Sequence, residues 1–284
     1  MEERVQKILS EWGIASRRGA EAMILAGRVR CNGTVVQLGQ KADPETDAIE
    51  VDRKLIQPSN RPKLVYLLLH KPAGVVSTCH DPQGRTTVMD LLSSDLQNGQ
   101  GIHPVGRLDV DSTGALLLTN DGKLTLGLTH PRHSIPKTYH VWVQGHPPEA
   151  VLEQWQQGVT LEGRKTRPAQ VRVISRRTDQ TCLEIILKEG RNRQIRRIAQ
   201  HLGYPVSQLH RTAIGSIRLQ QPGRTQLPKG HYRHLRDFEL RFLQDQIDLT
   251  EKGLGVRERK KGRISPTFAW NDTPQDERTT YTEN

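Results

Sequence analysis

Hydrophobic positions recur at helical spacing at the start of the chain and then alternate as in a strand. The helical face over residues 3–12 is formed by Val5, Ile8, Leu9 and Trp12. A second helix is predicted between Ser16, a typical N-cap residue, and Gly27. The segment 29–36, VRCNGTVV, alternates around an Asn-Gly turn, which predicts a β-hairpin. The pattern therefore predicts a small N-terminal module of two helices and a hairpin.

Apolar runs and period-two alternation predict further strands and one more helix downstream. The predicted strands lie at 64–69, 115–118, 137–143 and 181–187. The first of them ends in the loop sequence HKPAG. The second is followed by Asn120-Asp121-Gly122, so we expect it to enter a tight hairpin. After the last strand comes a helix whose apolar face is formed by Ile195, Ile198, Ala199 and Leu202. Polar residues at 56–61 predict a linker, and the apolar pattern fades beyond Leu243.

The composition favours a polyanionic partner and argues against several classes of protein. The 284 residues carry a formal net charge of +11, and basic side chains bind phosphate backbones. No apolar stretch approaches the ~18 to 20 residues of a membrane span, and the charged N-terminus differs from a signal peptide, so we expect a cytoplasmic protein. Cys31, Cys79 and Cys182 are widely scattered, which predicts neither disulfides nor a zinc site. His70 and His80 lack partners at ligand spacing and are predicted to be loop histidines, so no metal is expected.

Basic side chains gather in the N-terminal module. Acidic residues crowd into 43–52, while four arginines stand together outside that stretch: Arg17, Arg18, Arg28 and Arg30. This distribution predicts an electropositive face. Arg17 and Arg18 fall in the first turn of the second predicted helix, where the helix dipole disfavours cations but favours a phosphate. A solvated pair of arginines is the alternative interpretation.

Several polar residues occupy places that suit chemistry, although each also has an ordinary structural role. Asp109 and Asp111 lie in the irregular segment 107–114, where a loop presents carboxylates but where short carboxylates also bond their own backbone. Paired carboxylates are the general solution of glycosidases, so Asp109 with Asp111 or Asp121 is a second hypothesis. Tyr139, taken alone, is a core residue of a strand.

Three arginines are expected to lie on different sides of the predicted helix that follows Asn192. Arg193 and Arg197 are four residues apart and lie opposite the apolar face. Arg196 lies on the flank of that face, where a guanidinium can reach into a neighbouring cleft. A solvated helix surface is the alternative.

Four stretches resemble one enzyme family, the pseudouridine synthases. The segment 106–122, GRLDVDSTGALLLTNDG, resembles the signature of that family, and its GRLD form is similar to the branch that modifies ribosomal RNA under an S4-type RNA-binding domain. Residues 13–36, GIASRRGAEAMILAGRVRCNGTVV, resemble the S4 domain itself. Two further stretches resemble other parts of the catalytic domain: LLLHKPAGVVSTCHDPQGRTTVMDLL at 67–92 and EGRNRQIRR at 189–197.

The resemblance implies an enzyme that isomerises a uridine of ribosomal RNA to pseudouridine without a cofactor. It makes Asp109 the catalytic residue and gives Asp111 no role. It also implies that Tyr139 stacks on the target base, that Arg196 pairs with Asp109, and that Leu209 lies near the pocket wall. The expected RNA contacts are Arg17, Arg18, Arg28, Arg30, Arg107, Lys137, Arg193 and Arg197.

The fold and target follow from the same resemblance. We expect an α+β chain with an S4-like domain over 1–60, a synthase domain over 61–245 on a mixed, mainly antiparallel sheet, and a disordered basic and polar tail over 246–284. The N-terminal sequence resembles the large-subunit 23S-type enzymes. A 16S-type target and a non-catalytic S4-type rRNA-binding protein are the alternatives. We expect a monomer with ribosomal RNA as its partner.

Overall fold

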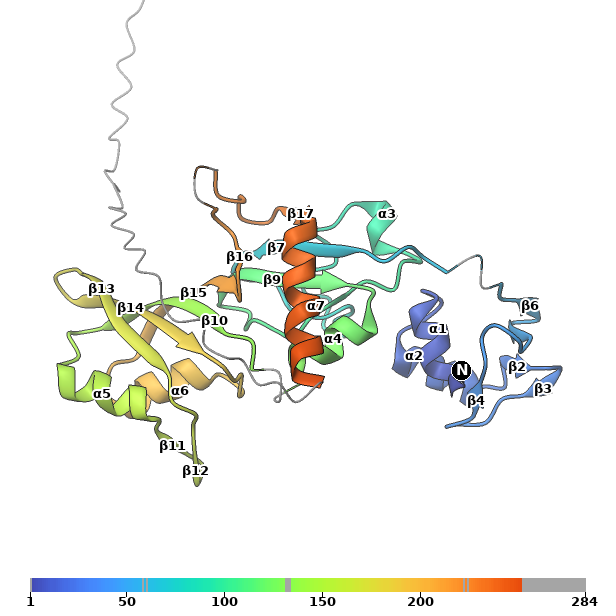
Figure 1. Ribbon diagram of the computed structural model, residues 1–284, viewed down its shortest axis with the longest axis horizontal. Coiled ribbons are helices and arrows are strands. Elements are labelled where there is room, and N and C mark those ends of the chain that lie inside the picture. The colour runs from blue at the N-terminus through green and yellow to red at the C-terminus, as the bar shows by residue number, and fades with distance from the viewer. Residues whose placement is uncertain are drawn as a thin grey trace, which may run out of the picture.

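The computed structural model describes residues 2–57, 59, 61–130, 134–221, 223 and 225–251 (Figure 1). The N-terminal module contains the helices α1 (Val5–Glu11) and α2 (Arg17–Leu25). Its short strands are β1 (Glu3–Arg4), β2 (Val29–Cys31), β3 (Thr34–Val35), β4 (Lys41–Ala42), β5 (Ile49–Val51) and β6 (Lys54–Leu55). As predicted, the Ser16 hydroxyl caps α2 by accepting a hydrogen bond from the Gly19 N–H at 3.1 Å.

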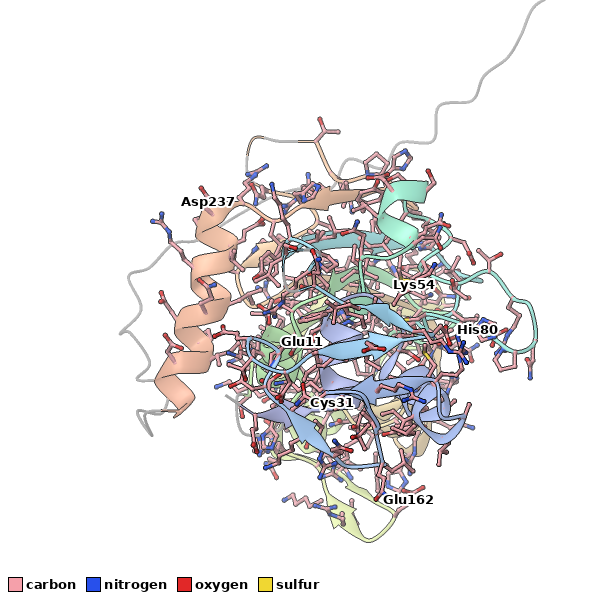
Figure 2. The ribbon with its side chains drawn as sticks, turned by 90° about the vertical axis from the view of Figure 1, so that its right-hand side faces the viewer. Glu11, Cys31, Lys54, His80, Glu162 and Asp237 are labelled. Atoms are coloured by element: carbon pink, nitrogen blue, oxygen red, sulfur yellow. The ribbon has the colours of Figure 1, made fainter. Side chains whose placement is uncertain are left out.

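The module has a hydrophobic core of its own. Val5, Ile8 and Leu9 of α1 pack with Ile24 of α2 and with residues of the small sheet. The predicted turn between β2 and β3 also forms, with Asn32 and Gly33 both at positive φ. Figure 2 looks onto this module and shows Cys31 and Lys54 on its sheet. The N-terminal pattern therefore folds as a separate unit rather than as part of the larger core.

The second part of the chain is built on one large sheet. Among the described residues nine strands take part, in the order β13-β14-β10-β15-β9-β7-β17, with β16 beside β15 and β8 beside β9. These strands are β7 (Tyr66–Lys71), β8 (His103–Pro104), β9 (Thr113–Thr119), β10 (Lys137–Gln144), β13 (Gln170–Arg176), β14 (Gln180–Leu187), β15 (Val206–Ile214), β16 (Ile217–Arg218) and β17 (Tyr232–His234). Every pairing is antiparallel except that of β15 with β9. The predicted α+β fold with a mixed, mainly antiparallel sheet is confirmed.

Helices cover different halves of this sheet on opposite faces. The helices are α3 (Ser94–Gln97), α4 (Gly122–Thr129), α5 (Glu149–Gln157), α6 (Gln194–His201) and α7 (Asp237–Glu251), and β11 (Thr160–Leu161) pairs with β12 (Arg164–Lys165) beside them. Trp155 of α5 and Ile198 of α6 belong to the core on one face. Leu128 of α4 and Leu243 of α7 belong to the core on the other. The two pairs of helices are separated along the sheet in Figure 1.

Three local predictions are corrected by the structure. Asn120-Asp121-Gly122 does not turn a hairpin, because the Asp121 carboxylate accepts hydrogen bonds from the N–H groups of Lys123 and Leu124 and thereby caps α4. The sequence His70-Lys71 is not a loop but the buried end of β7. Helix α7 continues past residue 245, where we expected the tail to begin. The reason is that Ile247 packs against the second core, which is the one that contains Leu128 of α4 and Leu243 of α7. Residues 252–284 lie outside the described residues.

Candidate active site

A buried lysine fixes the loop that carries Asp109. Lys71 is 0% exposed, and its ammonium donates hydrogen bonds to the main-chain oxygens of Pro72, Asp109 and Ser112 at 2.9, 3.1 and 2.9 Å. Burial lowers the pKa of Lys71 to about 8, although the carboxylates of Asp111 and Asp109 act in the opposite direction. The group is therefore still charged at neutral pH, and it holds the backbone on both sides of the loop.

A serine gives the same loop a second anchor. The Ser77 hydroxyl donates to the Leu108 oxygen at 2.9 Å and lies 3.2 Å from the Leu108 nitrogen. Within the loop the Ser112 N–H bonds to the Asp109 oxygen at 3.0 Å. The backbone is thus fixed while the Asp109 side chain stays 32% exposed. This is the arrangement in which a carboxylate keeps one direction but remains accessible to a substrate.

Two arginines at the start of α6 face the carboxylates of this loop. Arg193 Nη1 lies 3.5 Å from Asp109 Oδ2 and 3.7 Å from Asp111 Oδ1. Arg196 Nη2 lies 3.1 Å from Asp111 Oδ2, whereas Arg196 Nε lies 4.0 Å from Asp109 Oδ2. Asp109 thus lies between the two guanidinium groups, and the closest ionic contact of Arg196 is with Asp111.

The position of Arg193 differs from the prediction. Helix α6 begins at Gln194, and Arg193 precedes it in a left-handed conformation with a φ of +46°. The angular spacing of a helix therefore does not apply to Arg193, and its side chain turns toward the carboxylates. Arg197 does lie on the outer side, where its Nη2 is 2.7 Å from Glu162 in the turn between β11 and β12 (Figure 2).

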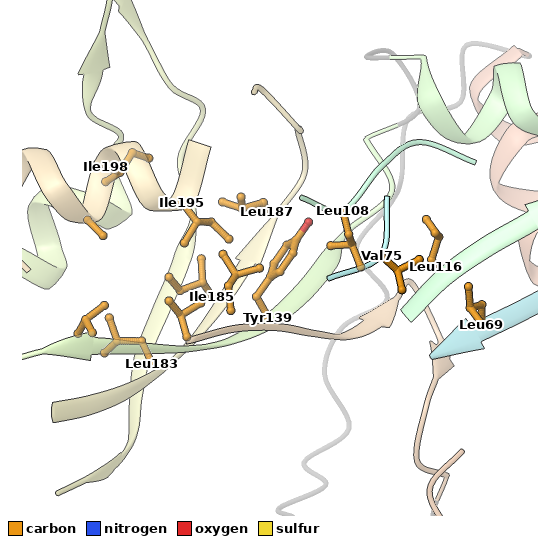
Figure 3. Packing of buried hydrophobic residues seen from close by; sticks show 14 of the residues in the cluster. Leu69, Val75, Leu108, Leu116, Tyr139, Leu183, Ile185, Leu187, Ile195 and Ile198 are labelled. Carbon is orange, nitrogen blue, oxygen red and sulfur yellow. The ribbon is translucent and has the colours of Figure 1, made fainter. Parts of the chain in front are cut away.

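Tyr139 and Leu209 contribute the apolar wall of the site. Tyr139 of β10 is 8% exposed, and its neighbours across the two adjacent strands are Ile185 and Arg211. Leu209 lies on the same face of β15, because side chains two residues apart point to the same side of a sheet. Figure 3 shows the Tyr139 ring pointing its hydroxyl toward the space between Leu187 and Leu108.

These groups enclose one pocket with a volume of about 250 Å³. It collects Asp109, Tyr139, Arg196 and Leu209, which the sequence analysis selected from separate segments. Of the predicted RNA contacts, Arg107, Lys137 and Arg193 also line it. The sequence analysis missed other polar residues of this pocket and its loop: Lys71, Arg191, Gln194 and Arg211. Strand periodicity counted from Leu209 is the pattern that places Arg211 on the Tyr139 face.

The predicted RNA contacts of the N-terminal module are exposed, but they are not equally free. Arg17 and Arg18 lie in the first turn of α2, as predicted. Arg28 instead pairs with Asp52, with Nη2 2.6 Å from Oδ2, so the electropositive face is weaker there than the sequence predicted. Arg30 donates to the Gly33 main-chain oxygen at 2.9 Å. The reason is that β5, which leads to Asp52, pairs with β2 and brings acidic residues beside the arginines.

Histidines and cysteines do not form a metal site in the part of the chain that the structure describes. There, no three side chains of His, Cys, Asp or Glu come together in a way that suits a metal ion. His70 is a buried strand residue rather than a loop histidine, and its Nδ1 lies 2.7 Å from the Leu227 oxygen. None of the described helices is both long and apolar enough to cross a membrane.

Comparison with known proteins identifies two families along the chain. Residues 65–201 match the RNA pseudouridylate synthase family, and residues 3–47 match the S4 domain. A protein of Bacillus subtilis named ribosomal large subunit pseudouridine synthase B is 39% identical over 249 residues, which cover 87% of this chain and 97% of that protein. A protein of the same name from Pseudomonas aeruginosa is 35% identical over 287 residues, covering 96% and 72%.

The fold agrees with these sequence matches. The crystal structure of a pseudouridylate synthase that is 30% identical to this chain superposes with a TM-score of 0.59, covering 84% of this chain and 99% of the other. The match thus extends over almost the whole of the solved protein. The chain therefore belongs to the RNA pseudouridylate synthase family, whose members are isomerases that act on RNA, and it carries an N-terminal S4 domain.

Proposed function

We propose that the enzyme isomerises a uridine of large-subunit ribosomal RNA and that Asp109 is its catalytic carboxylate. The observation that carries the assignment is the position of Asp109, on an anchored loop at the pocket and between two arginines. The names of the relatives from Bacillus subtilis and Pseudomonas aeruginosa support the large ribosomal subunit as the target. A 16S-type target is the alternative.

The chemistry asks for an ionised carboxylate near the sugar and a pocket that retains the base. Isomerisation breaks the bond between C1′ and N1 and rejoins the base through C5. Asp109 acts at the sugar, either by attack at C1′ or by abstraction of a proton from C2′. Arg193 and Arg196 place positive charge 3.5 and 4.0 Å from Asp109 Oδ2 and so favour one direction of its side chain.

The target uridine has to leave its stack before the sugar comes within reach of Asp109. Flipping a nucleotide costs ~a few kcal/mol, which stacking on an aromatic ring offsets in part. Tyr139 supplies the ring, and Leu209 closes the wall beside it. Arg107 at the pocket, together with Arg17 and Arg18 of the S4 domain, supplies phosphate contacts.

Replacing Asp109 by asparagine, with Asp111→Asn as the matched variant, tests the assignment. Each protein is incubated with transcripts of both ribosomal RNAs, and pseudouridine is mapped by reverse-transcription stops after carbodiimide treatment. We expect D109N to abolish isomerisation while RNA affinity stays within about a few-fold, because the carboxylate acts on the reacting sugar. D111N should keep measurable turnover, because Asp111 supports Arg196 and does not act on the sugar.

Each other outcome contradicts a specific part of the proposal. Activity in D109N would overturn the catalytic assignment. Modification of the small-subunit transcript alone would overturn the target. Release of free uracil would favour a glycosidase, which was the second hypothesis for these carboxylates. The cytoplasmic location and the monomeric state stay predictions.

A further inference from the structure

Arg211 is a buried cation at the pocket that none of the roles above uses. It is 4% exposed and lies on the Tyr139 face of β15. Its Nε donates to the Ala115 oxygen at 2.6 Å, but its Nη2 is buried and has no hydrogen-bond partner among the described residues. Within the same residues it forms no ion pair with a carboxylate. A buried guanidinium with a free donor at a pocket is costly unless a ligand completes it.

A second cation lines the same pocket next to Tyr139. Lys137 is half-buried, and its ammonium donates to the Ile135 oxygen at 3.2 Å. Burial lowers the pKa of Lys137 to about 8, and the positive charge of Arg211 acts in the same direction. The two groups therefore repel one another. An anion between them would remove this repulsion and supply the missing acceptor.

The reaction itself forms an anion of the right kind. When the bond between C1′ and N1 breaks, its electron pair stays with the base, so the detached base is the uracil anion with its charge spread over N1 and the two carbonyl oxygens. The same anion then uses an electron pair to form the bond from C5 to C1′. Loss of the C5 proton and protonation of N1 complete a net isomerisation. No oxidant, reductant or further reactant is needed.

We propose that Arg211 and Lys137 bind the carbonyl oxygens of the detached uracil and stabilise it as an anion while it turns. This inference rests on the proposed function. It assigns the two sides of the pocket different tasks, since Asp109 acts on the sugar and the two cations act on the base. Donors placed where charge develops, in a site shielded from water, stabilise a transition state more than a ground state.

The test compares two leaving bases in three variants. RNA fragments carry either uridine or 5-fluorouridine at the target position, and consumption of the N1-linked nucleoside is followed in single turnovers after digestion of the RNA. Fluorine withdraws electrons and makes the base anion more stable by itself. We expect R211M and K137M each to slow the uridine reaction by about 100-fold or more, as loss of an oxyanion donor does, but to slow 5-fluorouridine much less. R211K retains the charge and should recover most of the rate.

Controls separate this role from folding and from phosphate binding. Arg176→Met changes an exposed arginine of β13 and should leave both rates unchanged. Because Arg211 is buried, melting curves accompany each variant, and K137M keeps the test valid if R211M does not fold. An equal loss with both bases would overturn the inference. A lower RNA affinity with a shallower salt dependence would show instead that the cations hold a backbone phosphate.

The failure of the proposed function looks different from the failure of this inference. If the wild-type protein consumes no nucleoside in either ribosomal RNA, the proposed function is wrong. If the wild type is active but R211M and K137M react like wild type with uridine, only the anion site is wrong.

Discussion

Replacing Lys71 by methionine would remove the anchor of the Asp109 loop while keeping the length of the side chain. Three main-chain oxygens would lose a charged donor at 2.9 to 3.1 Å. Bonds to a charged group contribute about 1.5–3 kcal/mol each, so their loss costs roughly 5–9 kcal/mol. The substitution also removes the cost of burying a charged ammonium away from water, which is several kcal/mol and offsets part of this loss. We therefore expect a net destabilisation of about 3 kcal/mol, which corresponds to a fall in Tm of about 6–12 °C for a domain of this size.

The same substitution should affect turnover more than binding. A displacement of about 1 Å at a reacting group costs roughly 100-fold in rate, so K71M should slow single-turnover isomerisation by about that factor. Lys71 is fully buried and touches no ligand surface, so RNA affinity should stay close to that of the wild type. Lys54→Met, at an exposed lysine of the N-terminal module, is the control for both measurements. Normal melting and a normal rate in K71M would refute the idea that Lys71 positions Asp109.

Three further measurements test the charges of the site and of the module. The pKa of Lys71 is about 8 in the folded state against 10.5 in the unfolded chain, so between these values the unfolded state binds more protons and stability rises with pH. The difference in Tm between wild type and K71M should therefore shift in favour of the wild type from pH 8 to 10.5. A constant difference would contradict the lowered pKa. Arg196→Ala should reduce kcat by about 100-fold or more. Arg193→Ala removes a side chain that is 45% exposed and should reduce kcat by only about 10-fold. The reverse order would make Arg193 the main partner of Asp109. Deletion of residues 1–55 should weaken RNA binding and flatten the plot of log affinity against log salt concentration, and an unchanged slope would show that Arg17 and Arg18 are ordinary surface residues.

Local patterns predicted the elements well where only one interpretation was open. The alternation at 137–143 and 181–187 became β10 and β14, and the Asn-Gly turn formed as expected. Asn120-Asp121-Gly122 was open to two interpretations, since the same residues make tight turns and cap helices. The choice depends on Leu124 and Leu128, which pack into the second core and favour a helix at this point. That packing is tertiary and is not visible in a short window of sequence.

The candidate carboxylate was easier to select than the groups around it, because its segment resembles the signature of the family. Asp109 lies in a conspicuous loop segment, whereas Lys71 is 38 residues away in the sequence and looks like the start of a loop. Arg211 reaches the Ala115 oxygen across a separation of 96 residues. Whether a lysine or an arginine is buried depends on which strands are neighbours in the sheet. A charge pattern along the chain carries no information on that order.

The pocket lies where two parts of the sheet meet at a single parallel contact. Strand β15 pairs with β9 only through His210 with Thr113 and Arg211 with Gly114. A Cβ atom at Gly114 would lie 2.2 Å from the Arg211 oxygen, and the φ of +119° there favours glycine. This close approach helps to bring the loop before β9, with Asp109, next to the side chains of β10 and β15. Gly114 therefore matters to the site indirectly, because a larger residue would move the proposed catalytic carboxylate away from the cations that we propose to face the base.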